Sequence, residues 1–153
     1  MAQKSKKEHI IQTALTLFLE HGFKGTSVDL VVKISSVSKP TVYNHFPDKA
    51  ALMESVIETW VENHQPKINQ IKDSLTLNKV IESEWLTSEA LRLYALVIGE
   101  GRRFPAAKHL FWQSFDENWQ KALTHSTEKS ALPVDLAVKT LMDQHLITRL
   151  KKI

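Results

Sequence analysis

Apolar residues recur every three or four positions along most of this chain, and that spacing is the strongest constraint on its fold. Ile10, Ala14 and Leu17 would share one face of a helix, and Val56 and Trp60 repeat the pattern further on. Only four Gly and five Pro interrupt the 153 residues, which is few for a protein built from many β-turns. We therefore expect an all-α fold.

The expected helices begin and end at recognisable capping residues. Gly22 suits the left-handed stop of the first helix, while Ser38 and Asp48 suit the N-caps of the third and fourth. The β-branched run within 28–34 would also suit a strand, and the state of 80–85 stays open. The segment 88–103 is apolar around most of its circumference, so we expect it at the centre of the protein. The expected helices cover about 5–20, 27–34, 39–45, 49–64, 66–75, 88–103, 106–124 and 133–150.

The net charge of +3 lies entirely in the first third of the chain. Residues 1–50 carry seven lysines against four acids, whereas residues 51–153 carry thirteen charges of each sign. A basic module on a neutral body suits an anionic partner such as nucleic acid. The plain alternative is a solvated, lysine-rich N-terminal region.

The sequence lacks the residues that several classes of functional site require. Cysteine is absent, which excludes disulfides, thiolate zinc sites and a cysteine nucleophile. The seven histidines fall at unrelated intervals, and there is no glycine-rich phosphate loop, so we expect no metal, no cofactor and no enzyme activity. No apolar run approaches the ~20 residues that span a bilayer, so we expect a cytoplasmic protein without a membrane partner.

Residues 27–46 have the form of a helix, a tight turn and a short second helix, which is the helix-turn-helix arrangement. A DNA major groove about 12 Å wide admits one α-helix, and the preceding helix braces it. Val42 and Phe46 are the expected inward residues of the second helix. Its outward residues are small, basic or able to form hydrogen bonds.

Residues 7–53 resemble the N-terminal domain of the TetR family of bacterial transcriptional regulators. The most specific part is the run from Ser38 to Lys49, with Tyr43, His45 and Phe46 in its Tyr-x-His-Phe core. Further matching positions are Ile11, Ala14, Leu17, Phe18, Gly22, Phe23, Thr26, Ser27, Val28, Val37 and Leu52. The resemblance implies a three-helix DNA-binding domain joined to a helical body that dimerises and often encloses a small-molecule pocket.

Two positions depart from the pattern of this family. Ser35 and Ser36 stand in the turn where the family commonly has Ala-Gly, and a serine is less comfortable than glycine at positive φ. Val32 replaces the usual alanine of the second helix and needs more room against the recognition helix.

The resemblance assigns DNA contacts residue by residue. Ser27, Tyr43 and Lys49 are expected at phosphates, and packing within the module is the alternative for Tyr43. Lys39 and Asn44 are expected to read bases, since lysine favours guanine acceptors and asparagine pairs with adenine. The expected set is Ser27, Ser38, Lys39, Thr41, Tyr43, Asn44, His45 and Lys49.

Thr41 suits a thymine methyl group, and His45 resembles a backbone contact of the family. Lys4, Lys6 and Lys7 are expected either to reach phosphate as an arm or simply to keep the chain soluble.

The remainder of the chain resembles the family more weakly, in residues 93–105 and 134–138. Dimerisation also has an independent reason, because one short recognition helix contacts too few base pairs for useful specificity. The helices at 106–124 and 133–150 are the candidates for the dimer face. The expected interface residues are Phe115, Trp119, Leu141 and Leu146. The expected ligand pocket is lined by Trp60, Trp85, Tyr94, Phe111 and Trp112, with ordinary core packing as the alternative for each tryptophan. Glu100 is expected to form a structural ion pair with Arg102 or Arg103.

The sequence therefore predicts a helix-turn-helix domain over 1–48 and a helical dimerisation and ligand domain over 49–153, connected by helix 49–64. The expected function is that of a homodimeric, sequence-specific regulator that binds a palindromic operator in double-stranded DNA. We expect a repressor that a small apolar or cationic ligand releases. The segment between Pro105 and Pro133 is about three helical turns shorter than is usual in the family. The alternative is therefore a constitutive DNA-binding or interaction module of the same fold without a working pocket.

Overall fold

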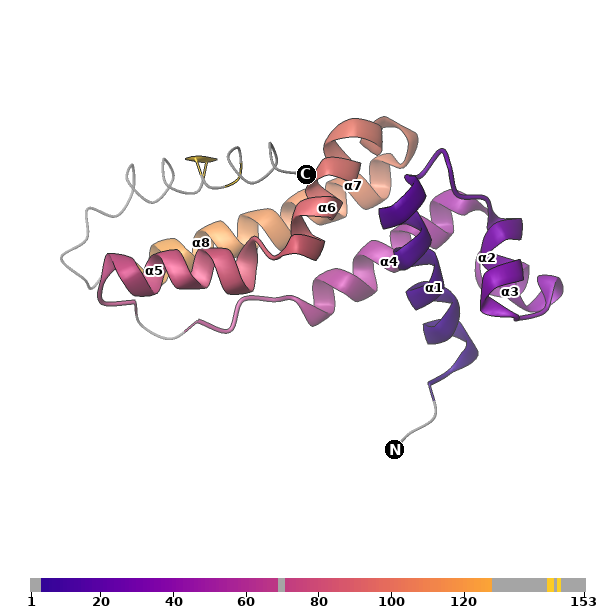
Figure 1. Cartoon of the computed structure of the whole chain (residues 1–153), viewed down its shortest axis with the longest axis horizontal. Coiled ribbons are helices and arrows are strands. Elements are labelled where there is room, and N and C mark those ends of the chain that lie inside the picture. The colour runs from indigo at the N-terminus through magenta and orange to yellow at the C-terminus, as the bar shows by residue number, and fades with distance from the viewer. Residues whose placement is uncertain (1–3, 69–70, 128–142, 145, 147–153) are drawn as a thin grey trace. The chain divides into compact units, whose positions relative to one another are not determined.

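The computed structural model describes residues 4–68, 71–127, 143–144 and 146, and all the regular elements within these ranges are helical (Figure 1). The all-α prediction is confirmed. The α-helices are α1 Lys6–His21, α2 Val28–Ser35, α3 Lys39–His45, α4 Lys49–Asn63, α5 Ser74–Val80, α6 Ser88–Glu100, α7 Pro105–Phe111 and α8 Glu117–Thr127. Short turns of other helix types connect them: π-helical turns at Ile81–Trp85 and Trp112–Asp116, and a 3-10 turn at Gly101–Arg103.

The chain packs as two compact units. The first contains residues 1–63 and 96–111, and the second contains 64–95 and 112–153. Helix α4 packs against both α1 and α7 within the first unit. The domain boundary at 48/49 stays a prediction.

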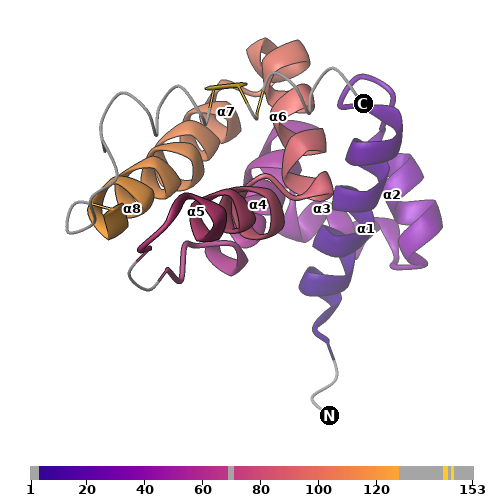
Figure 2. The same cartoon turned by 60° about the vertical axis from the view of Figure 1, so that its left-hand side comes forward.

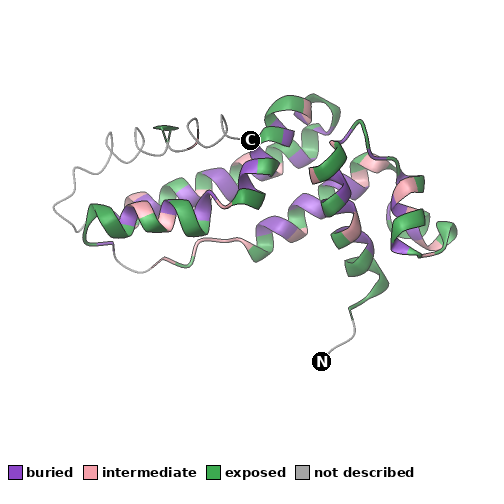
Figure 3. Ribbon diagram, viewed as in Figure 1, coloured by how far each residue is buried: buried purple, intermediate pink, exposed green. Residues whose placement is uncertain are grey.

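The first unit is built on α1 and α4. Ser5 and Glu8 form a reciprocal capping box at the start of α1, and Gly22 ends the helix with a φ of 74°. The buried residues of α1 and α4 lie on different sides of these helices from the exposed ones (Figure 3). They form the core of this unit with Val31, Val42, Phe46 and Phe104.

Helices α2 and α3 fold together beside α1, as both views show (Figures 1 and 2). The alternative of a strand at 28–34 is wrong, because Val28 and Val31 face the core at helical spacing. Ser27 caps α2 by accepting a hydrogen bond from the Leu30 N–H at 3.0 Å. Ser36 then takes the left-handed conformation expected in this turn, with a φ of 56°.

The second unit has an aromatic core. Trp85 and Trp119 stack with their ring centroids 6.2 Å apart, and Phe115 meets Trp119 edge-on. The Trp119 indole N–H donates to the His64 carbonyl, and the Ile71 N–H donates to the carbonyl of Ser126. These bonds tie His64 and Ile71, which precede α5 in the sequence, to α8.

The expected helix at 66–75 is wrong. Residues 66–68 and 71–73 have no regular structure, and α5 begins only at Ser74. The Asp73 side chain is the reason, because it accepts hydrogen bonds from both the N–H and the hydroxyl of Thr76 and so starts a helix. These bonds also lower the pKa of Asp73.

Helix α6 is buried on one side and exposed on the other, although the apolar pattern of 88–103 predicted a central position. Thr87 caps α6 by accepting a hydrogen bond from the Ala90 N–H, and the helix exposes Ala95, Gly99 and 59% of Ile98. The expected helix 106–124 is present with a π-helical turn inside it. Of the expected helix 133–150, only residues 143–144 and 146 are described, and they are helical; the rest lies outside the described residues.

A buried polar network crosses the core of the second unit. The Trp85 indole N–H donates to the Tyr94 hydroxyl at 3.2 Å, and this hydroxyl donates to Asp116 Oδ1 at 2.5 Å. The Gln120 side-chain amide donates to Asp116 Oδ2 at 2.7 Å. Burial raises the pKa of Asp116, because it disfavours the charged carboxylate. Burial and the neighbouring Asp116 charge raise the pKa of Tyr94.

The raised pKa of Asp116 predicts the pH dependence of stability. A carboxyl group with a higher pKa in the folded state costs stability once it ionises, and the cost disappears as the pH falls through the folded pKa. Asp116→Asn should therefore raise the free energy of unfolding at neutral pH, on the order of 1 kcal/mol. The exposed Gln120 amide can rotate to accept from the new side chain. Urea titrations between pH 7 and pH 4 should show this advantage shrinking; an advantage that grows on acidification would contradict the assignment.

Candidate nucleic-acid interface

Helix α3 is held by two residues and leaves its other face exposed. Val42 and Phe46 are 0% and 1% exposed and fix the helix to its module, as the sequence predicted. The outward residues Lys39, Tyr43, Asn44 and His45 are exposed, and Thr41 is half-buried. Five of the predicted DNA-binding residues thus lie on one seven-residue helix.

Ser38 occupies the N-cap position of α3 without forming the expected side-chain cap. Its hydroxyl instead shares a hydrogen bond of 2.7 Å with the Thr41 hydroxyl. Pro40 in the first turn lacks an N–H, so the helix start has one backbone donor fewer to satisfy. The Ser38–Thr41 pair presents two hydroxyls side by side at this end of the helix.

Lys39 is oriented by residues on two helices. Its ammonium lies 2.8 Å from Asp29 Oδ1 on α2 and 5.6 Å from the centroid of the Tyr43 ring. The hydrogen bond to Asp29 and its negative charge raise the pKa of Lys39. This role of Asp29 cannot be seen in the local spacing of the sequence, because the pairing joins two helices.

Tyr43, Asn44 and His45, at the end of α3, are exposed to solvent. Tyr43 is 37% exposed with its ring beside Lys39, so it both packs within the module and presents surface. Asn44 is exposed, and the His45 ring lies 5.9 Å from that of Phe46.

Two of the predicted phosphate contacts already hold the module together. The Ser27 hydroxyl accepts from Leu30 at the start of α2, and the residue stays exposed. Lys49 is half-buried, its ammonium donates to the Phe23 carbonyl at 2.8 Å, and it lies 4.4 Å from the centroid of the Phe23 ring. A phosphate contact by Lys49 stays a prediction.

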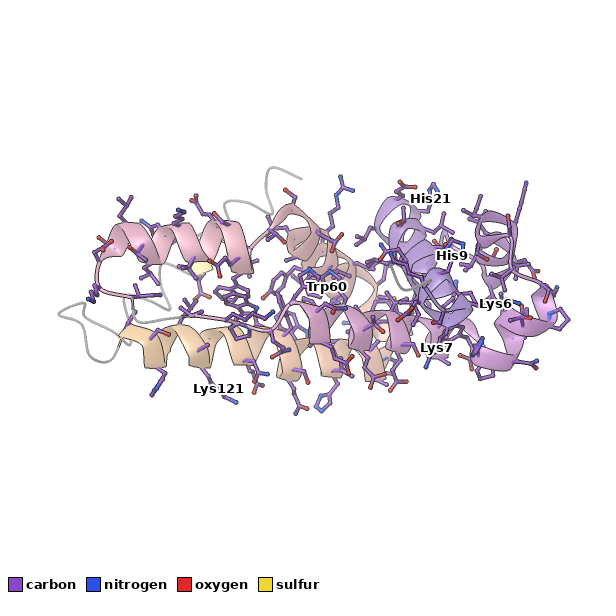
Figure 4. All side chains as sticks on the ribbon, turned by 90° about the horizontal axis from the view of Figure 1, so that it is seen from below. Lys6, Lys7, His9, His21, Trp60 and Lys121 are labelled. Atoms are coloured by element: carbon purple, nitrogen blue, oxygen red, sulfur yellow. The ribbon has the colours of Figure 1, made fainter. Side chains whose placement is uncertain are left out.

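The N-terminal lysines lie on a separate part of the module. Lys6 and Lys7 lie in the first turn of α1 (Figure 4) and are exposed, as is Lys4 before the helix. On the same helix, His9 bonds the Ser35 carbonyl at 3.0 Å and so ties α1 to the end of α2. This bond is a further contact that sequence spacing did not reveal.

The structure divides the predicted ligand residues between its two units. Trp60 and Phe111 pair in the first unit with ring centroids 6.3 Å apart (Trp60 in Figure 4). Trp85, Tyr94 and Trp112 come together in the second unit, with 5.7 Å between the last two rings. The first unit also has an open pocket of about 300 Å³, and none of the predicted ligand residues lines it. Its lining is Asp48, Ala50, Ala51, Glu54, Phe104, Pro105, Ala106 and Ala107.

Two of the predicted dimer residues are buried in the core of the second unit. Phe115 and Trp119 are 0% and 2% exposed, Leu146 is half-buried, and Leu141 lies outside the described residues. The dimer face therefore stays a prediction.

Among the described residues, no three His, Asp or Glu side chains gather closely enough to hold a metal ion. In the same part of the chain, no helix combines the length and the apolar character needed to cross a membrane.

Known proteins resemble the chain most clearly over the helix-turn-helix module. Residues 10–56 match the family model of bacterial regulatory proteins, tetR family. The uncharacterised HTH-type transcriptional regulator YuxN of Bacillus subtilis (strain 168) is 38% identical over 69 residues, which cover 45% of this chain and 24% of YuxN. The HTH-type transcriptional regulator AcrR of Shigella flexneri is 28% identical over 165 residues, covering 91% of this chain and 75% of AcrR. The chain thus spans about a quarter of one of these relatives and three quarters of the other.

A solved structure extends the similarity to the body of the chain. The flavonoid-responsive regulator FrrA is 30% identical with a TM-score of 0.61, over 81% of this chain and 67% of that one. The helix-turn-helix geometry, the family model and these relatives agree. The chain belongs to the TetR family of bacterial regulatory proteins.

Proposed function

We propose that this chain is a sequence-specific, DNA-binding transcriptional regulator. The observation that carries the proposal is the exposed face of α3, which Val42 and Phe46 hold from behind. An α-helix with its side chains is about 10–12 Å across, so the seven-residue α3 fits a major groove about 12 Å wide. Exposed lysine, asparagine and tyrosine side chains on such a helix suit base edges and phosphates.

The geometry supports different roles for the residues of the interface. Lys39 is charged and held at the start of α3, where it suits the acceptors of a guanine. Asn44 suits an adenine, and Thr41 suits a thymine methyl group or a hydrogen bond. Tyr43, His45, Ser27 and the lysines of the first turn of α1 suit phosphates; Lys49 would have to leave the Phe23 carbonyl to join them.

We further propose a homodimer on a palindromic operator. One seven-residue helix reaches only a few base pairs, and a two-fold axis doubles the site. The family membership supports this arrangement.

For regulation, we propose a repressor that a small molecule releases. The support is the gathering of Trp85, Tyr94 and Trp112 in the second unit, together with the name of the related regulator FrrA, which responds to a flavonoid. The second candidate is a constitutive DNA-binding module. It is favoured by the stacked Trp85 and Trp119, which fill the core of that unit with their own rings.

Asn44→Ala and Lys39→Ala should each weaken binding to the preferred duplex, because each removes base-edge hydrogen bonds. The expected loss is about 1–3 kcal/mol per substitution, with relaxed preference at one position of the site. Fluorescence anisotropy on a duplex selected from a random double-stranded library measures both.

Lys79→Ala is the matched control for the lysine substitution. It removes the same charge from an exposed position on α5 and should change affinity little. Equal affinity of the wild-type chain for selected and random duplexes would overturn the proposal, as would Asn44→Ala and Lys39→Ala variants that bind as the wild type does.

A ligand that releases the chain from DNA should also raise its melting temperature, because binding to the folded state stabilises it by mass action. A thermal-shift screen of aromatic, apolar and cationic compounds, followed by competition against the selected duplex, tests this. A shift of several degrees with release of DNA supports the repressor. Compounds that stabilise the chain without releasing DNA would favour the constitutive module.

A further inference from the structure

The last residue of α6 holds the turn that leads into the helix-turn-helix. The Glu100 carboxylate accepts the Phe23 N–H on Oε1 and the Lys24 N–H on Oε2, both at 2.9 Å. Residues 23 and 24 lie in the turn between α1 and α2, within the same compact unit as Glu100. Hydrogen bonds from two backbone donors to one carboxylate are charge-assisted and therefore strong.

The carboxylate fits against a glycine. A Cβ atom at Gly22 would lie 2.5 Å from Glu100 Oε1, closer than any real contact allows. The φ of 74° at Gly22 is itself unfavourable for other residues. Gly22 thus ends α1 and also makes room for Glu100.

Phe23 is fixed on its other sides as well. Lys49, the first residue of α4, donates to the Phe23 carbonyl and lies over its ring. The Phe23 ring stacks with Phe18 at 5.7 Å and meets Phe104 at 4.8 Å. The turn before α2 is therefore held by groups from α1, α4 and α6, and Glu100 is the group that takes its N–H donors.

The ion pair that the sequence predicted for Glu100 is the weaker of its contacts. Arg103 Nε lies 3.8 Å from Oε2, and the arginine side chain is 54% exposed. Both backbone hydrogen bonds are shorter, and only 25% of the Glu100 side chain is exposed. The main partner of Glu100 is the α1–α2 turn.

We propose that Glu100 is a positioning residue for DNA recognition. By holding the Phe23 and Lys24 amides, it sets where α2 begins and so where α3 presents its exposed face. This inference rests on the proposed DNA binding. It predicts that DNA affinity depends on an acidic residue that makes no contact with DNA.

The sign of the effect separates this role from general electrostatics. Removing a negative charge from a DNA-binding protein strengthens its attraction to the phosphate backbone. Loss of a positioning residue weakens binding, because the recognition helix is no longer preorganised. The two explanations therefore predict opposite changes in affinity.

The test uses the full chain and the selected duplex, with anisotropy titrations at several salt concentrations. Glu100→Ala should weaken binding about tenfold or more, and Glu100→Gln, which keeps one acceptor oxygen, should fall between it and the wild type. The salt slope should stay that of the wild type, because the number of phosphate contacts is unchanged. Amide hydrogen exchange should quicken at Phe23 and Lys24.

Two further variants separate geometry from charge. Gly22→Ala keeps the Glu100 charge but forces the carboxylate away, and it should also weaken binding. Glu58→Ala removes an acid from an exposed position on α4 and should leave affinity unchanged or slightly raised.

Tight binding by folded Glu100→Ala, or lost affinity with unchanged exchange at Phe23 and Lys24, would overturn the proposal. If Glu100→Ala does not fold, the Glu100→Gln variant decides by the same two measurements. A wild-type chain that does not prefer the selected duplex would refute the proposed function instead. That failure is seen before any variant is made.

Discussion

The backbone at Phe23 is the point on which the first unit depends. The Phe23 carbonyl accepts from Lys49, and the N–H groups of Phe23 and Lys24 donate to Glu100, two residues far away in the sequence. The Phe23–Lys24 peptide group therefore has an opposite charge at each of its two poles, and Lys49 also lies over the Phe23 ring. A short turn ordinarily moves more freely than the helices it joins. Here its position is set by α4 and α6, so the first residues of α2 start from a fixed place.

The recognition helix cannot be stable by itself, because seven residues are far fewer than an isolated helix needs in water. Its stability comes from burying Val42 and Phe46, which uses one face and leaves the other free. The Asp29–Lys39 pair then orders the start of this free face. An exposed ion pair adds little stability, so its effect is mainly to limit where the lysine ammonium lies before DNA arrives.

The sequence predicted correctly those features that depend on residues close together in the chain. The positive φ at Gly22 and Ser36 and the buried anchors of α3 were all legible in the sequence, because each follows from neighbours a few positions away. The expected helix at 66–75 is wrong because Asp73, inside the expected range, caps a helix that begins only at Ser74. The partners of Glu100 and Lys39 were missed for a different reason: several acceptors or donors suit each side chain, and only the packed fold selects one.

The polar network of the second unit limits what a ligand there would have to offer. Asp116 already accepts hydrogen bonds from Tyr94 and Gln120, so a ligand that displaced either would first lose a bond to a charged group, about 1.5–3 kcal/mol each. A purely apolar molecule forms no hydrogen bond to Asp116 and so does not compensate for that loss. A cation or a hydrogen-bond donor can bind the Asp116 carboxylate and so replace the lost bond. The faces of the Trp85 and Trp119 rings also attract positive charge. Of the two ligand classes that the sequence left open, the burial of this carboxylate favours the cationic one wherever the ligand reaches Asp116.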